Sequence, residues 1–310
     1  MLSKGEVISV NISEEKGELK YSVKSIELDK NGVVGDAHAG PWNRQVSLLN
    51  FESIERFNAE NKIKIKPGEF AENITLGGID LTKVKILDRL KIDDVLLEVT
   101  QIGKKCHGDK CHIYQAVGKC VMPKEGIFCR VIRGGRIKVG SEIEYSKRKL
   151  KVFIVTLSDR AFAGEYEDRS GPQALQLIDE FLQEHAWDRE IEPVLLSDDT
   201  DKLEKKLKQA IEQKFDLIFT LGGTGIGARD ITPEVVLPLC EKIIPGIMEN
   251  IRIKYGATIP SALLSRSIAG ISGQSQIYTL PGSVKAVKEY LSELFNTIEH
   301  AVYMLHGIGH

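Results

Sequence analysis

The fold of the second half of this chain is decided by the stretch Asp216-Leu217-Ile218-Phe219-Thr220-Leu221-Gly222-Gly223-Thr224-Gly225-Ile226-Gly227-Ala228-Arg229-Asp230-Ile231-Thr232-Pro233-Glu234. Its apolar beginning predicts a buried strand, and Thr232-Pro233-Glu234 predicts a helix start with a capping hydroxyl, a proline at the first helical position and an early acid. Glycines between a strand and a helix let backbone N–H groups point at an anion. The stretch therefore predicts a phosphate-binding loop, with Asp230 placed to meet a metal or a reacting phosphate.

The loop lacks the Gly-Lys-Ser or Gly-Lys-Thr of a Walker motif, and its glycines do not fit the dinucleotide-binding fingerprint. A strand-to-helix turn that needs glycine only for its geometry is the alternative. The clustering of Thr224, Arg229 and Asp230 within one turn favours the anion site, because an ordinary tight turn has no use for all three.

The chain has 310 residues, which at roughly 150 residues per domain indicates two domains. The boundary is expected at the basic stretch Ser146-Lys147-Arg148-Lys149, giving domains of residues 1–147 and 151–310. The sequence contains no apolar run of about 18 residues, and its first residues lack the apolar core of a signal peptide. We therefore expect a cytoplasmic protein without a membrane segment.

Charge divides unevenly between the halves. Residues 1–150 carry 26 Lys plus Arg against 21 Asp plus Glu, a net charge of +5, and residues 151–310 carry 16 against 23, a net charge of −7. This asymmetry is too mild to indicate nucleic-acid binding, and a solvated surface explains it.

The first half is predicted to be mainly strands, at residues 5–10, 21–26, 94–100 and 128–132, separated by Gly, Asn and Asp turns. One helix is predicted over Leu49–Glu60, because Phe51, Ile54 and Phe57 have helical spacing. A small β-barrel with one helix fits this pattern.

In the second half, strands alternate with helices. Strands are predicted at residues 152–156, 194–196, 216–221 and 276–280, and helices at 173–185, 201–213, 244–255 and 283–305. This alternation predicts a three-layer α/β/α domain with a mostly parallel sheet.

Polar motifs follow these strands: Ser158-Asp159-Arg160, Ser197-Asp198-Asp199, the loop of residues 222–230 and Pro281-Gly282-Ser283. Ligands of such sheets bind beyond the carboxyl ends of the strands, so the four motifs are expected to line one site. Each alone is also explained by a turn or a helix cap, as in the case of Ser197-Asp198-Asp199-Thr200.

Residues 151 to about 305 resemble the molybdopterin-binding domain of the MogA and MoaB family. The carriers of the resemblance are Thr156-Leu157-Ser158-Asp159-Arg160, residues 164–172, residues 222–234, Ser265-Arg266 and Leu280-Pro281-Gly282-Ser283. The resemblance implies an α/β domain, commonly trimeric, that binds molybdopterin and adenylylates its terminal phosphate with Mg-ATP. The product of that reaction is the substrate for metal insertion.

The resemblance also implies roles for particular residues. Asp230 and Asp198 match the two functional aspartates and would hold Mg²⁺, although Asp199 is adjacent to Asp198 and is an alternative. The residues expected to bind the pterin and the nucleotide are Ser158, Asp159, Gly222, Gly223, Thr224, Gly225, Thr232, Ser265, Arg266, Pro281, Gly282 and Ser283.

Residues 1 to about 147 resemble another family, the MOSC domain, named for the C-terminal part of molybdenum cofactor sulfurase. The carriers are residues 35–40, 44–49, 67–74 and 98–106. This resemblance implies a β-rich domain that handles sulfur or binds the finished cofactor, with Cys106 as the characteristic cysteine. Within the same motifs, His38 and Arg44 are candidates for binding a phosphate or oxyanion.

The five cysteines are an odd number, and four of them lie within residues 106–129. Cys106 is expected to be a persulfide carrier or a molybdenum ligand, since the neighbouring Lys104, Lys105 and His107 would lower its pKa. A zinc or iron–sulfur site at Cys106, Cys111 and Cys120 is the alternative, although the spacing lacks CxxC pairs. Two further cysteines are expected to be structural: Cys129 and Cys240.

Two functions remain. The first is a molybdopterin adenylyltransferase that needs no pyridoxal phosphate and exchanges sulfur or cofactor with its own first half and with molybdenum-insertion and sulfur-transfer proteins. The second is a non-catalytic carrier of molybdopterin or molybdenum cofactor. Asp230 and Asp198 favour the enzyme, because a pure binder does not need them.

Overall fold

The computed structural model describes residues 3–16, 18–105, 114 and 119–308. The chain divides into two compact units, residues 1–148 and residues 149–310. In the part of the chain that is described, no helix is both long and apolar enough to cross a membrane.

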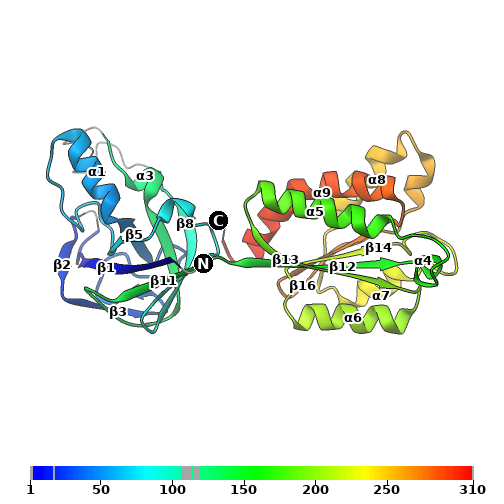
Figure 1. Ribbon diagram of the computed structural model, residues 1–310, viewed down its shortest axis with the longest axis horizontal. Helices are drawn as coiled ribbons and strands as arrows, with labels where there is room; N and C mark the ends of the chain where they lie inside the picture. The colour runs from blue at the N-terminus through cyan, green and yellow to red at the C-terminus, as the bar shows by residue number, and fades with distance from the viewer. Residues whose placement is uncertain (1–2, 17, 106–113, 115–118, 309–310) are drawn as a thin grey trace. The chain divides into compact units, whose positions relative to one another are not determined.

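The first unit is built mainly of strands, as its sequence predicts (Figure 1). In chain order the strands are β1 (Ser3–Ile12), β2 (Tyr21–Val23), β3 (Ser25–Asp29), β4 (Gly32–Val33), β5 (Val46–Asn50), β6 (Ile74–Gly77), β7 (Arg89–Ile92), β8 (Val95–Ile102), β9 (Ile127–Arg133), β10 (Gly135–Lys138) and β11 (Glu142–Ser146). The helices are α1 (Phe51–Asn61), the 3₁₀ helix η1 (Leu81–Lys83) and α3 (Met122–Glu125).

Seven of these strands close into a barrel. The order β11-β7-β8-β9-β5-β6-β1 is completed by pairing of β1 with β11, and β2 extends beyond β1. The neighbours are antiparallel except β5 and β6, which are parallel. A smaller sheet has the order β10-β3-β4.

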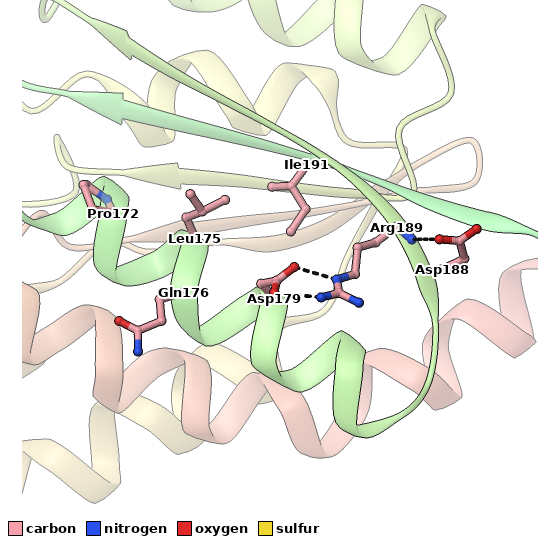
Figure 2. Close-up of a pocket in the computed structure, with 7 residues that line it drawn as sticks. All are labelled: Pro172, Leu175, Gln176, Asp179, Asp188, Arg189 and Ile191. Atoms are coloured by element: carbon pink, nitrogen blue, oxygen red, sulfur yellow. Dashed lines mark hydrogen bonds and ion pairs between the residues drawn. The ribbon is translucent and has the colours of Figure 1, made fainter.

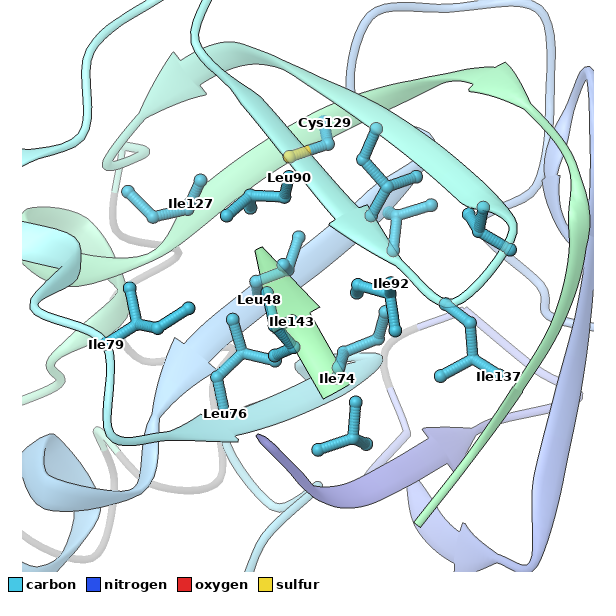
Figure 3. Packing of buried hydrophobic residues seen from close by; sticks show 14 of the residues in the cluster. Leu48, Ile74, Leu76, Ile79, Leu90, Ile92, Ile127, Cys129, Ile137 and Ile143 are labelled. Atoms are coloured by element: carbon cyan, nitrogen blue, oxygen red, sulfur yellow. The ribbon is translucent and has the colours of Figure 1, made fainter. Parts of the chain in front are cut away.

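Alternation along the strands fills the barrel. In β8, Val95, Leu97 and Val99 are fully buried at every second position and therefore point inward. Figure 3 shows this apolar interior, which includes Leu48 of β5 and Ile74 of the neighbouring strand β6. The predicted helix is present as α1, and its buried Ile54 and Phe57 pack in a second apolar cluster.

The second unit is a six-stranded sheet with helices on both sides. Its strands are β12 (Lys149–Leu157), β13 (Asp188–Leu196), β14 (Leu217–Leu221), β15 (Lys242–Ile243), β16 (Ala269–Ser272) and β17 (Ser275–Leu280). Its helices are α4 (Asp159–Phe162), α5 (Ser170–Glu184), α6 (Thr200–Glu212), α7 (Thr232–Val236), η3 (Leu237–Leu239), α8 (Pro245–Gly256), η4 (Pro260–Leu264) and α9 (Val284–Leu305). Figure 1 shows α5 and α9 on one side of the sheet and α6 and α7 on the other.

The sheet is mixed: three of its five strand pairings are parallel, in agreement with the mostly parallel sheet that the sequence predicted, and two are antiparallel. In the order β13-β12-β14-β17-β16-β15, the first four strands are parallel and the last two pair antiparallel. The reason is local: only Gly273 and Gln274 separate β16 from β17, and a two-residue turn can join only antiparallel strands. The four parallel strands all end at the same edge.

Candidate functional site

The loops that follow the four parallel strands are joined by backbone hydrogen bonds. Directly after β12 in the sequence, the N–H of Ser158 donates to the carbonyl of Leu196 at the end of β13, at 3.0 Å. Directly after β14, the N–H of Gly222 donates to the carbonyl of Leu280 at the end of β17, at 2.9 Å. The structure therefore brings the polar motifs predicted at the strand ends to one edge of the sheet.

Asp159 and Asp198 form a reciprocal pair across two of these loops. The N–H of Asp159 donates to Oδ2 of Asp198 at 3.2 Å, and the N–H of Asp198 donates to Oδ1 of Asp159 at 3.0 Å. Burial raises the pKa of Asp198, and the charge of Asp159 also raises it, against the opposing effects of the backbone N–H of Asp159 and of Arg229. Two carboxylates are thus held close together at the strand ends.

The alternative residue Asp199 has a different environment. Its side chain caps α6, where Oδ1 accepts from the N–H of Lys202 at 3.0 Å, and its Oδ2 lies 3.4 Å from Nζ of Lys202. A carboxylate used for capping is less available to a ligand than one that faces the other loops. The geometry favours Asp198 over Asp199 as the functional aspartate.

The glycine loop needs glycine at its first two positions. Gly222 has φ +106° and Gly223 has φ +64°, a region of backbone that disfavours side chains. A Cβ on Gly222 would lie 2.5 Å from the carbonyl oxygen of Leu157, and one on Gly223 would lie 2.5 Å from Oγ1 of Thr232. Within the described residues, the N–H groups of Gly223, Thr224 and Gly225 donate to no protein acceptor. These donors suit a phosphate.

The predicted capping role of Thr232 is wrong. The helix α7 begins at Thr232 itself, its N-cap is Ile231, and no side chain caps it. Instead, the fully buried hydroxyl of Thr232 donates to the carbonyl of Gly222 at 2.8 Å. Thr232 therefore stabilises the conformation of the glycine loop through this bond. Thr224 is also buried, with 3 % of its surface exposed.

Asp230 folds back toward its own loop. Its Oδ2 accepts from the N–H of Gly227 at 2.8 Å, and a Cβ on Gly225 would lie 2.7 Å from the same oxygen. This bond holds the carboxylate in position. Within the described residues, Oδ1 accepts no hydrogen bond and is available to a ligand.

Arg266 holds the glycine loop through its partly exposed side chain. Its Nε donates to the carbonyl of Gly225 at 2.6 Å, its Nη2 donates to the carbonyl of Asp230 at 2.7 Å, and its Nη1 pairs with Glu234. Its backbone N–H also donates to the carbonyl of Thr224 at 2.8 Å. These contacts show that Arg266 fixes the loop, and its expected place on the pterin side stays a prediction.

The remaining candidates lie around the same loops. Ser158 caps α4, and Ser283 caps the long helix α9 by accepting from the N–H of Ala286 at 3.2 Å. Next to Ser283, a Cβ on Gly282 would lie 3.2 Å from the Cα of Gly222, so β17 delivers the start of α9, through Pro281 and Gly282, close to the glycine loop. Ser265 accepts from the hydroxyl of Tyr290 at 2.9 Å. Because α9 begins next to Gly282, the positive end of its helix dipole lies near the glycine loop, which is the candidate phosphate site.

A magnesium ion fits this donor set in one particular way. No group of three or more His, Cys, Asp or Glu side chains with metal-binding geometry occurs among the described residues. Mg²⁺ is commonly held by one or two carboxylates together with phosphate oxygens of the substrate. Asp198 and Asp230 would supply that number of carboxylates, so the residues fit a magnesium ion whose other ligands are phosphate oxygens.

One pocket of the second unit lies elsewhere. It has a volume of about 550 Å³ and is lined by side chains of α5 and of the edge strand β13, as Figure 2 shows. Arg189 spans it and donates to both carboxylate oxygens of Asp179, at 2.5 and 2.7 Å. None of the loop residues described above lines this pocket, so it is separate from the candidate site.

In the first unit, Asp36 is the centre of a buried polar network. Its Oδ2 accepts from the N–H of Ser13 and from Nδ2 of Asn73, both at 3.1 Å, and pairs with the ammonium of Lys20. Its Oδ1 accepts from the N–H of His38 at 3.0 Å. The side chains of Asp36 and Lys20 are each 1 % exposed. This network fixes the loop that carries the candidate anion-binding residues.

His38 and Arg44 are brought together through Trp42. The indole N–H of Trp42 donates to the carbonyl of His38 at 3.0 Å, and the guanidinium of Arg44 lies 5.4 Å from the Trp42 ring centroid. The ammonium of Lys16 lies 5.9 Å from the same ring. Neither Arg44 nor Lys16 pairs with a carboxylate within the described part of the chain. The two cations at the Trp42 ring form a cationic cluster, of which the sequence identified Arg44 and missed Lys16.

The cysteines divide into two groups. Cys106 and Cys111, with His107, lie outside the described residues, so the sulfur and zinc predictions for them stay predictions. Cys129 lies fully buried in the barrel core, where burial raises its thiol pKa, as its alternating position predicts. Cys240 is half-buried, and burial raises its pKa to about 11. Neither thiol is suited to nucleophilic chemistry.

The sequence placed Arg229 in the cluster that favours an anion site but assigned it no role of its own. Its guanidinium reaches from the glycine loop to the carboxylate of Asp159 and forms an ion pair there. Its place beside Asp230 was visible in the sequence, but its partner lies 70 residues away in the chain. Only the parallel pairing of β12 with β14 brings the two together.

Comparison with known proteins gives two family matches in the same order as the two units. The family described as probable molybdopterin binding domain matches residues 153–300, and the MOSC domain matches residues 35–144.

Curated relatives match the second half. Molybdopterin adenylyltransferase of Helicobacter pylori strain J99 is 37 % identical over 159 residues, which cover 51 % of this chain and 89 % of that protein. Molybdopterin adenylyltransferase of Escherichia coli K12 is 32 % identical over 160 residues, covering 51 % and 80 %. Gephyrin of Dictyostelium discoideum is 37 % identical over 162 residues, covering 50 % of this chain and 22 % of that protein.

Proposed function

Because this chain belongs, through its second unit, to the MogA- and MoaB-type family of molybdopterin-binding domains, we propose that this unit transfers an adenylyl group from Mg-ATP to molybdopterin. A terminal phosphate oxygen of the pterin attacks the α-phosphorus of ATP, the bond from that phosphorus to the pyrophosphate oxygen breaks, and pyrophosphate leaves. No general base is required, since a phosphate monoester is already ionised at neutral pH.

The observation that carries this proposal is the gathering of unused N–H groups and carboxylates at one sheet edge. The N–H groups of Gly223, Thr224 and Gly225 would bind a phosphate of the nucleotide, next to the N-terminus of α9. Asp198 and Asp230 would hold Mg²⁺, which supplies charge neutralisation for the polyphosphate when bound. Arg266 keeps the loop in place through the carbonyls of Gly225 and Asp230.

These residues would act mainly by positioning the two substrates, because nucleotidyl transfer needs little covalent chemistry from the protein. Ser265, Ser283 and the Pro281-Gly282 turn are proposed to line the pterin side. Thr232 acts indirectly, because its hydroxyl fixes the carbonyl of Gly222. Ser158 and Asp159 hold the loop of Asp198 beside the end of β12, and Asp159 also pairs with Arg229 of the glycine loop.

The test is release of pyrophosphate by the full chain when molybdopterin, Mg²⁺ and ATP are present together. We expect release that needs all three reactants and is lost in Asp198→Ala and Asp230→Ala. If the chain binds the pterin and releases no pyrophosphate, under conditions in which a known transferase is active, the protein is a carrier and not an enzyme.

For the first unit we propose sulfur handling or binding of the finished cofactor, with His38 and Arg44 contacting an anionic group. The cationic cluster around Trp42 supports anion binding. We also propose a three-layer arrangement of the second unit, a cytoplasmic location and a homotrimer. Light scattering of the purified chain would test the trimer, and a monomer would reject it.

A further inference from the structure

Arg229 connects two loops of the candidate site. It lies in the glycine loop between Gly227 and Asp230, and its guanidinium pairs with the carboxylate of Asp159 on the neighbouring loop. The Arg229 side chain is 70 % exposed, and the nearby Ile226 is 71 % exposed. The outer part of the glycine loop therefore has little packing that would oppose movement of Arg229.

The guanidinium faces more than one negative charge. Asp159 is in contact with Asp198 through the reciprocal hydrogen bonds between their carboxylates and backbone N–H groups. Two carboxylates this close repel each other, and a nearby cation relieves the repulsion. Arg229 is the described cation that pairs with either of them.

Arg229 differs in this respect from Arg266, the other arginine of the loop. Arg266 donates to two backbone carbonyls, and backbone carbonyls remain acceptors whatever enters the site. Among the described residues, Arg229 pairs only with the carboxylate of Asp159, and a divalent cation competes for carboxylates. Arg266 also pairs with the carboxylate of Glu234, but its two bonds to backbone carbonyls persist if that ion pair is lost. The contact of Arg229 is therefore exchangeable, whereas the backbone contacts of Arg266 are permanent.

Mg-ATP supplies a cation for the aspartates and an anion for Arg229. The divalent cation takes over the neutralisation of the aspartates, and the polyphosphate offers oxygens that match the fork of a guanidinium. We propose that Arg229 is an exchangeable counter-ion: it pairs with Asp159 in the empty site and moves to the polyphosphate of the nucleotide when a divalent cation reaches the carboxylates. This inference rests on the proposed adenylyl transfer, because it assumes that a nucleotide polyphosphate is the ligand.

Two binding measurements on the full-length protein test the exchange without turnover. The first is Mn²⁺ binding without nucleotide, followed by electron paramagnetic resonance. Arg229→Ala removes the internal competitor, so we expect Mn²⁺ to bind about two- to fivefold more tightly, the range for one partly exposed ion pair. The second is ATP binding by calorimetry with Mg²⁺ and without pterin, where we expect Arg229→Ala to bind about tenfold more weakly or worse.

The opposite direction of the two effects distinguishes exchange from a structural role. Arg229→Lys should restore part of the ATP affinity, because it keeps the charge and loses the fork. Arg56→Ala is the matched control, since it removes an exposed arginine that pairs with Glu125 in the other unit, and it should change neither binding constant.

Weaker Mn²⁺ binding by Arg229→Ala would overturn the proposal, because Arg229 would then only position the aspartates. Unchanged ATP affinity would overturn it as well. Failure of the proposed function is seen separately, as the absence of pyrophosphate release from the wild-type chain that still binds Mg-ATP.

Discussion

Gly223 gives the sharpest test of how the glycine loop is built. With φ +64° and a neighbouring Oγ1 of Thr232 only 2.5 Å from its ideal Cβ, Gly223→Ala meets both backbone strain and a steric clash. Gly273 is the matched control: its φ is +57°, but nothing lies within 4 Å of its ideal Cβ. The pair separates the cost of the backbone region from the cost of the contact.

The magnitudes follow from these two terms. A left-handed backbone costs a residue with a Cβ about 1–2 kcal/mol, which is the whole expected effect of Gly273→Ala. Overpacking adds about 1–3 kcal/mol, so Gly223→Ala is expected to cost about 2–5 kcal/mol. With a urea m-value of about 2 kcal/mol/M, the midpoints should fall by about 0.5–1 M and 1–2.5 M.

The assay is urea unfolding of the full chain with tryptophan fluorescence. The chain has two tryptophans, so Trp42→Phe leaves the buried Trp187 as a reporter of the second unit. Thr232→Ala removes the clashing hydroxyl, and in the Gly223→Ala background it should recover about 1 kcal/mol or more relative to additivity. Equal midpoint losses for Gly223→Ala and Gly273→Ala, without coupling to Thr232, would refute the reasoning.

Three further predictions concern other parts of the chain. Asp198→Ala should lower adenylyl transfer at least about hundredfold. Asp199→Ala should retain transfer and cost about 1 kcal/mol of stability, because the α6 cap is lost. Loss of transfer in Asp199→Ala with transfer retained in Asp198→Ala would make Asp199 the functional residue. In the first unit, burial alone would raise the pKa of Asp36, but His38 and Lys20 outweigh it and hold this pKa well below its usual range. The stabilisation is complete above the unfolded pKa of about 3.9 and is lost as the pH falls further. Asp36→Asn should therefore lower the free energy of unfolding by about 3–5 kcal/mol at pH 7 and make it depend less on pH below about 4, measured by unfolding with Trp42 as reporter. The same loss of stability at acidic pH in Asp36→Asn and the wild type would contradict the proposed network. Cys106→Ser should abolish retention of persulfide sulfur or molybdenum, measured by elemental analysis, whereas Cys129→Ser should retain it; equal retention would reject Cys106, and stoichiometric zinc would favour the zinc alternative.

The sequence predicted most of the architecture because the signals are local. Alternating β-branched residues predicted the strands of the barrel, and the helical spacing of Ile54 and Phe57 predicted α1. The two family resemblances are confirmed by the matches to residues 35–144 and 153–300. The antiparallel strands β15 and β16 were missed, since a two-residue and a four-residue strand carry little periodicity of their own.

The site was predictable in its location and less so in its detail. The rule that ligands bind beyond the ends of parallel strands placed the motifs together without knowledge of side-chain directions. Whether Thr232 caps a helix or supports Gly222, and whether Arg266 faces a ligand or the loop, depends on hydrogen bonds between distant segments. The pairing of Arg229 with Asp159 is of the same kind.

The central claim is that the second unit turns over the phosphate that its glycine loop binds. Mass spectrometry of the pterin recovered from the wild-type chain, after incubation with molybdopterin and Mg-ATP, tests this claim most directly. We predict a pterin that has gained one adenylyl group, and none in the Asp198→Ala chain. A protein saturated with unmodified molybdopterin in the presence of bound Mg-ATP would contradict the claim.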